Sequence, residues 1–85
     1  MTDRELDALA TEKILGGGAG IISDRAELAA LIEDEIERRG LLDDYATALL
    51  SMKTESGYIQ SDYAFLIRAT PAQRRDAALK ATGNL

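Results

Sequence analysis

Length, composition and charge limit the kind of protein that this chain can be. It has 85 residues, of which 46% are apolar and 29% charged, and a formal net charge of −5. This balance of apolar and charged residues is typical of a globular chain. The length leaves room for one domain, which we place over residues 1–85. A domain of this size buries only about 60% of the surface that its unfolded chain exposes, and self-association as a homo-oligomer is one common supplement to so small a core.

Two absent residue types exclude whole classes of chemistry. The sequence has no cysteine and no histidine, which excludes disulfides, thiol nucleophiles, Cys-type zinc sites and the commonest general base and metal ligand. Only carboxylate, lysine or tyrosine chemistry would remain. The sequence therefore predicts a protein that is not an enzyme and that uses no cofactor or metal.

The charge and the apolar pattern also restrict partners and compartment. Net negative charge disfavours nonspecific binding to nucleic acid and to anionic membranes, which both depend on basic surfaces. No apolar run approaches the roughly 18 residues that span a bilayer, and no apolar signal region follows the charged start of the chain. We expect a cytoplasmic protein that binds neither nucleic acid directly nor a membrane, but a small ligand or a basic protein surface.

The first helix is expected over residues 3–15. Thr2 and Glu5 have the spacing of a capping box, and Gly16 stands where a helix-ending glycine belongs. Between them apolar residues recur at helical spacing: Leu6, Leu9, Ala10 and Ile14. The glycine-rich run 16–20 follows a helix and lacks the Lys-Ser/Thr of a phosphate-binding loop, so we interpret it as a flexible connector.

Two further helices are indicated by their apolar stripe and their caps. Over residues 24–39 the basic last turn suits the helix dipole, Gly40 follows as a stop, and four apolar residues share one face: Leu28, Leu31, Ile32 and Ile36. Near the end of the chain, Thr70, Pro71 and Gln73 supply a cap, a first-turn proline and a capping-box partner in order. This last helix is expected to run to about Ala81.

The segment 41–69 fits two kinds of secondary structure. With period two, 45–52 and 63–67 read as strands joined by a hairpin loop at 53–57; with period 3.6, both read as helix. Alanine content favours helix, whereas the aromatic and β-branched residues over 58–67 favour strand. In either case we expect the aromatic residues in the core, with Tyr58 the most exposed of them: Tyr45, Tyr58, Tyr63 and Phe65.

Both ends of the chain resemble a family of small phage proteins. The run from Leu6 to Gly16, LDALATEKILG, resembles the opening helix of phage proteins with an "ABA sandwich" domain, which ends in a Glu-Lys-Val/Ile-Met/Leu-Gly signature. The segments 69–73 and 77–81 resemble the family's closing helix. The chain departs from the family in having no tryptophan, and in carrying Arg75 and Asp76 where members usually have a cysteine or another apolar residue.

The resemblance favours strands for the middle segment and a phage or prophage source. It implies an α+β fold, with a small antiparallel sheet of two or three strands packed against about three helices; an all-α fold is the alternative. Relatives of this type include proteins that counter bacterial immunity. We therefore expect a non-enzymatic accessory protein in the host cytoplasm that inhibits a defence component, such as a CRISPR effector, by stoichiometric binding. Sequestration of a cyclic nucleotide signal and a role in virion structure or assembly are the alternatives.

The densest acidic cluster supplies the candidate partner-binding residues. An acidic surface could compete with nucleic acid for a basic groove on a host or defence-system protein. Helical ion pairs between Asp34 and Arg38 and between Glu35 and Arg39 offer a simpler explanation, in which the cluster is only a solvated face. The candidate residues are Glu33, Asp34, Glu37, Asp43 and Asp44.

Basic residues around the last helix supply the alternative site. Arg74 and Arg75 lie in its first turns, near backbone amides that favour anions, and Arg68 precedes them. Together they could bind a phosphorylated ligand such as a cyclic nucleotide. An ordinary distribution of surface charge is the competing interpretation.

Overall fold

The fold is built from helices alone in the part of the chain that the structure describes. The computed structural model describes residues 2–16, 24–56 and 61–85. Its helices are α1 (Asp3–Lys13), α2 (Arg25–Arg38), α3 (Leu42–Ser56), α4 (Asp62–Arg68) and α5 (Pro71–Ala81). The expected α+β fold with an antiparallel sheet is therefore wrong, and the all-α alternative agrees with the structure.

The three helices expected outside the middle segment are present and begin at their caps. The Thr2 hydroxyl accepts a hydrogen bond from the Glu5 amide at 3.2 Å, and the Thr70 hydroxyl accepts one from the Gln73 amide at 3.1 Å. In both cases the side chain of the third helical residue bonds back to the amide of the cap. The Asp24 carboxylate caps α2. Each cap provides a hydrogen-bond acceptor for amides that have no partner inside the helix. The residues around each helix start therefore determine where the helix begins.

The first half of the ambiguous segment is α3, and its side chains show why helix prevails. Tyr45 and Leu49 are buried and Met52 is half-buried, at a spacing that places all three on one side of a helix. A strand would have put the exposed Thr47 and Ser51 on the same face as Tyr45 and Leu49. Only the helical period collects the apolar side chains on one face.

The second half contains α4, which begins where the Ser61 hydroxyl accepts a hydrogen bond from an amide of the first turn. Phe65 and Ala69, four residues apart, are buried. Tyr63 is 74% exposed and Ile67 59% exposed. The expectation that Tyr45 and Phe65 belong to the core is confirmed and that for Tyr63 is wrong, while Tyr58 lies outside the described residues.

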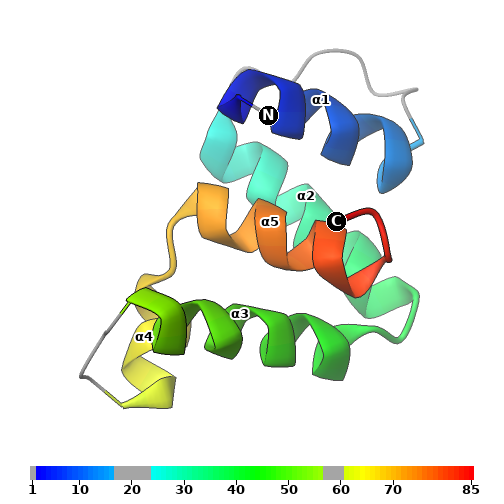
Figure 1. The fold of residues 1–85 in the computed structure, drawn as a ribbon. Coiled ribbons are helices and arrows are strands. Elements are labelled where there is room, and N and C mark those ends of the chain that lie inside the picture. Colours follow the sequence, from blue (N-terminus) through cyan, green and yellow to red (C-terminus); the bar gives the residue numbers. More distant parts are fainter. Residues whose placement is uncertain (1, 17–23, 57–60) are drawn as a thin grey trace.

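Helix α5 forms the centre of the core and packs against α1, α2 and α3. Figure 1 shows α5 between α1 and α3, with α2 running behind it and α4 beside α3. Ala77, Ala78 and Leu79 of α5 are fully buried, and the two small alanines let neighbouring helices approach closely. The largest fully buried side chains are Ile14, Ile32, Ile36, Leu49 and Leu79.

The turn from α2 into α3 depends on Gly40. Its φ of +72° lies in the left-handed region that side chains with a Cβ avoid. The amide of Leu41 donates back to the carbonyl of Ile36 at 3.0 Å, which closes the end of α2. The glycine stop expected from the sequence is therefore present, and the acidic first turn of α3 follows it closely in the chain.

Candidate functional site

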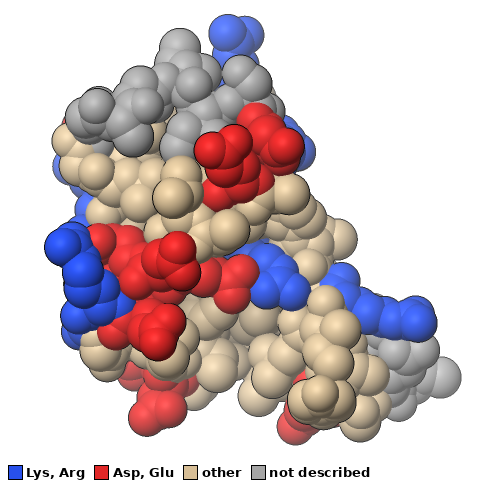
Figure 2. All heavy atoms as spheres, turned by 180° about the vertical axis from the view of Figure 1, so that it is seen from behind, with Lys and Arg blue, Asp and Glu red and all other residues tan. Residues whose placement is uncertain are grey.

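The predicted partner-binding residues fall into two groups. Asp34, Glu37, Asp43 and Asp44 are exposed, and none of them makes an ion pair or a side-chain hydrogen bond with another described residue. We call these four residues the acidic corner. Glu33, in contrast, is half-buried and bound to Arg74. Figure 2 shows acidic side chains gathered on one face of the molecule, with basic side chains at their margin.

The helical ion pairs expected at the end of α2 are present in a different combination. Glu35 pairs with Arg39 at 3.3 Å and also binds Arg38, whose Nε donates to Glu35 Oε2 at 3.0 Å. The hydrogen bond from Arg38 lowers the pKa of the Glu35 carboxyl from its ordinary value. Because Arg38 turns to Glu35, no described cation neutralises Asp34.

Part of the acidic corner also has a structural role. Asp43 and Asp44 occupy the first turn of α3, where negative charge stabilises the positive end of the helix dipole. Asp34 and Glu37 are three residues apart on the exposed side of α2 and have no such role. These two carboxylates are therefore the most informative positions for testing function.

Glu33 belongs to a polar cluster between α2, α3 and α5. Arg74 Nη1 donates to Glu33 Oε1 at 2.9 Å. The hydroxyl of Tyr45 is buried close enough to Glu33 and Arg74 for both to shift its pKa, but it makes no well-formed hydrogen bond with any described residue. Burial, and after it the charge of Glu33, raises the pKa of the Tyr45 phenol far above its ordinary value, with Arg74 acting in the opposite direction.

The rest of the Arg74 guanidinium binds the end of α4. Nε donates to the carbonyl of Ala69 at 3.0 Å, and Nη2 donates to the carbonyls of Leu66 and Ile67 at 3.1 and 3.3 Å. These carbonyls lie at the helix end, where no further turn supplies amides. Arg74 therefore connects α4 to Glu33 of α2.

Arg75 is the only charged residue among those classed as buried in the described chain, with 2% of its surface exposed. Its Nη1 donates to Asp7 Oδ1 at 2.7 Å and to the Asp3 carbonyl at 3.2 Å, and its Nη2 lies 3.1 Å from Asp3 Oδ1. Asp76 Oδ1 is 2.8 Å from both Nε and Nη2. Burial by itself would lower the pKa of Arg75, but the hydrogen bonds that it donates to Asp7, Asp76 and Asp3 outweigh it and raise that pKa.

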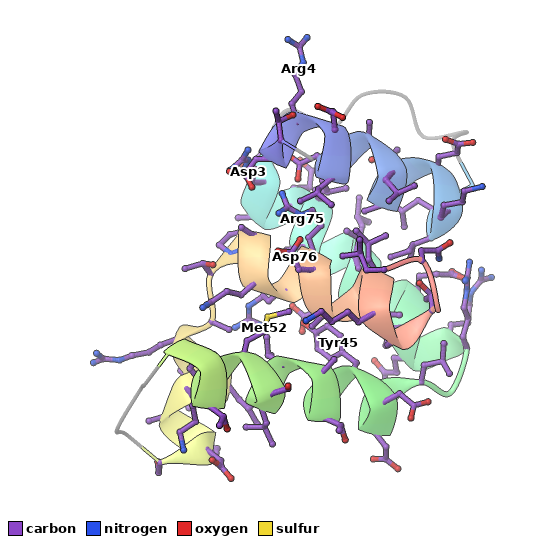
Figure 3. All side chains as sticks on the ribbon, viewed as in Figure 1. Asp3, Arg4, Tyr45, Met52, Arg75 and Asp76 are labelled. Atoms are coloured by element: carbon purple, nitrogen blue, oxygen red, sulfur yellow. The ribbon has the colours of Figure 1, made fainter. Side chains whose placement is uncertain are left out.

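A second arginine extends this network to α2. Arg25 lies 3.3 Å from Asp7 and 3.7 Å from Asp3, so each of these two carboxylates of α1 stands between two guanidinium groups. Figure 3 shows Arg75 lying between α1 and α5 near Asp3 and Asp76, whereas Arg4 points away from the fold. The network holds α1, α2 and α5 together at one end of the bundle.

The alternative ligand site predicted at Arg68, Arg74 and Arg75 does not present three guanidinium groups that are free to bind a ligand. The Arg75 guanidinium donates four hydrogen bonds to Asp3, Asp7 and Asp76 and makes a further close ion-pair contact with Asp76, so little of it is left for a ligand. Arg74 is committed to Glu33 and the end of α4. Of these three arginines, Arg68 alone is exposed and makes no ion pair or side-chain hydrogen bond with a described residue.

Sequence reasoning missed the buried network although a signal for it exists. Arg75 lies on the same side of α5 as Ala78 and Leu79, three and four residues later, and this spacing predicts burial. Asp3 and Asp7 are likewise four residues apart on α1. A cation on an apolar stripe requires such carboxylate partners.

Other site types find no support in the described residues. Within 2–16, 24–56 and 61–85, no three carboxylates are arranged to hold a metal ion, and no helix has the length and apolar composition of a membrane span. In comparisons with known proteins, no family model, curated protein or solved structure matches the chain. The resemblance to ABA-sandwich proteins therefore stays a prediction.

Proposed function

We propose that the protein acts without catalysis, by stoichiometric binding of the acidic corner to a basic surface on a partner protein. One observation carries this proposal. Asp34, Glu37, Asp43 and Asp44 are exposed and unpaired, whereas Asp3, Asp7, Glu33 and Glu35 are consumed by ion pairs within the fold. The chain therefore keeps a group of carboxylates that its own described cations do not neutralise.

Exposed carboxylates of this kind suit the capture of a basic protein. Each keeps its hydration until a partner arrives, and their summed field accelerates the encounter with a positively charged surface. Because such interactions are screened over about 8–10 Å at ordinary ionic strength, binding should weaken as salt is added.

The narrower hypothesis is a phage protein that inhibits a bacterial defence component in the host cytoplasm. It is motivated by the resemblance at both ends of the chain and by the acidity, since a component that binds nucleic acid has a basic groove. Sequestration of a cyclic nucleotide and a virion role are not favoured by any contact in the site, because Arg75 and most of Arg74 are already bonded within the fold.

Affinity capture from bacteria that carry CRISPR systems tests the proposal. The bait is the wild-type chain, the double variant Asp34→Asn/Glu37→Gln, or the matched control Glu12→Gln/Glu27→Gln, which removes two exposed carboxylates elsewhere. We expect wild type and control to retain a basic protein, and the double variant to bind it about two- to thirtyfold more weakly, since exposed ion pairs contribute roughly 0.2–1 kcal/mol each. Equal retention by all three baits, or no specific partner on any of them, would refute the proposal.

A further inference from the structure

The Glu33–Arg74 pair connects helices α2 and α4, whose backbones do not lie side by side. Among the described helices, the backbone of α4 comes close to that of α3 only. Arg74 reaches from α5 to both, donating to Glu33 of α2 at 2.9 Å and to three carbonyls at the end of α4. A change at Glu33 can therefore reach α4 through one side chain.

Helix α4 depends on such an external contact. It has seven residues, and Phe65 is the only residue within its bounds that is classed as buried. A helix this short is not stable by itself, because nucleation costs more than so few backbone hydrogen bonds return. The bonds from Arg74 to its terminal carbonyls supply part of what α4 lacks.

Tyr45 offers Glu33 a second hydrogen-bond donor. Its hydroxyl is buried beside the Glu33–Arg74 pair without a hydrogen-bond partner among the described residues. An unsatisfied buried hydroxyl costs about 1–3 kcal/mol. An arrangement in which Tyr45 donates to Glu33 removes that cost, so the departure of Arg74 is partly compensated.

Glu33 also lies within reach of a partner bound to the acidic corner. It precedes Glu37 by four residues and therefore shares its side of α2, and a third of its side chain is exposed, at 33%. Only Oε1 of its carboxylate is bonded to Arg74. A lysine or arginine that approaches Glu37 can thus reach the Glu33 carboxylate as well.

We propose that Glu33 and Arg74 form a displaceable latch. A basic side chain of the partner takes the place of Arg74 at Glu33, the Tyr45 hydroxyl donates to the same carboxylate, and the end of α4 is released. The mechanism rests on the proposed binding of a basic partner. It makes the position of Tyr63 and Ile67, the most exposed large apolar residues of the described chain, dependent on that binding.

Hydrogen exchange of the α4 amides tests the latch without a partner. We expect Glu33→Gln to accelerate exchange at Phe65, Leu66 and Ile67 about threefold, as the loss of one partly exposed ion pair implies. Asp34→Asn, which removes a neighbouring carboxylate that Arg74 does not touch, should leave exchange unchanged. Unchanged exchange in Glu33→Gln, or equal acceleration in both variants, would overturn the latch.

A second arm uses an eight-residue arginine peptide as the basic probe, with binding followed by fluorescence anisotropy. Bound peptide should accelerate α4 exchange in the wild type, less in Tyr45→Phe, and not further in Glu33→Gln. Binding without acceleration in the wild type overturns the latch and leaves the proposed function standing. Absence of binding counts against the proposed function, and the latch is then decided by Glu33→Gln alone.

Discussion

Arg75 Nη1 donates to Asp7 Oδ1 at 2.7 Å, so that a cation buried in the central helix is neutralised by the N-terminal helix. Asp3 and Asp76 complete its coordination from α1 and α5. A fold of this size has few ways to fix the position of an outer helix. Here the position of α1 is specified by charge as well as by apolar contact.

Replacement of this cation should destabilise the protein strongly. We expect Arg75→Ala to lower the free energy of unfolding by about 3 kcal/mol, because the carboxylates lose their partner and a buried side chain is removed. Arg75→Lys should recover only part of the loss, since an ammonium group cannot reproduce five directed donors. Urea unfolding followed by circular dichroism measures both. The exposed, unpaired Arg68→Ala is the control, and a similar small effect in Arg68→Ala and Arg75→Ala would contradict the role given to the network.

The two readings of the segment 63–67 predict opposite patterns of mutational sensitivity. In a strand, Tyr63, Phe65 and Ile67 share one face, whereas in α4 only Phe65 points into the core. We expect Phe65→Ala to cost about 3 kcal/mol and Tyr63→Ser and Ile67→Ser to stay within about 0.5 kcal/mol. Thermal or urea unfolding of the three variants distinguishes helix from strand. Comparable large losses in the free energy of unfolding at all three positions would favour the strand.

Local signals were sufficient for much of the fold. Thr2 with Glu5 and Thr70 with Gln73 placed two helix starts correctly, since a capping box depends only on residues three apart. The middle segment was harder, because alanine favours helix while aromatic and β-branched residues suit a strand, and β propensity is dominated by tertiary context. The resemblance to ABA-sandwich proteins favoured the strands there, and the structure has helices.

The candidate site was predictable in composition but not in its pairings. That acidic residues gather near the end of α2 followed directly from sequence, and Asp34 and Glu37 are indeed exposed. The partners of Glu33 and Arg75 could not be read in the same way. Arg74 is 41 positions from Glu33, and Asp7 is 68 positions from Arg75. Such contacts form only when the helices pack together, so the spacing of residues along the sequence cannot predict them.

The turn at Gly40 should tolerate a side chain poorly for a purely conformational reason. A Cβ added there would meet no atom within 4 Å, so steric contact with neighbours is not the obstacle. The obstacle is the φ of +72°, which residues with a Cβ avoid. We therefore expect Gly40→Ala to lower the free energy of unfolding by about 1–2 kcal/mol. Gly40→Asn should cost less, because asparagine adopts this conformation more readily. A larger loss in the asparagine variant than in the alanine variant would point to a contact instead of a backbone effect.

The buried phenol of Tyr45 should make stability fall at alkaline pH. Its pKa is raised in the folded protein, first by burial and then by the charge of Glu33. The neutral phenol is thus favoured by the fold, and its contribution is complete below the ordinary tyrosine pKa of about 10. Above that pH the unfolded chain loses a proton that the folded chain keeps. The free energy of unfolding should then fall by about 1.4 kcal/mol per pH unit from this group until the folded-state pKa is reached.

Tyr45→Phe isolates this effect from the other titrating groups. At neutral pH the variant should be as stable as the wild type or slightly more so, because the hydroxyl has no hydrogen-bond partner among the described residues. Between about pH 10 and 11 the wild type should lose stability faster than the variant. Parallel urea titrations across this range measure the difference. Identical slopes would mean that the phenol reaches solvent or a partner in solution, and the proposed exchange of Arg74 for Tyr45 at Glu33 would then lose its driving force.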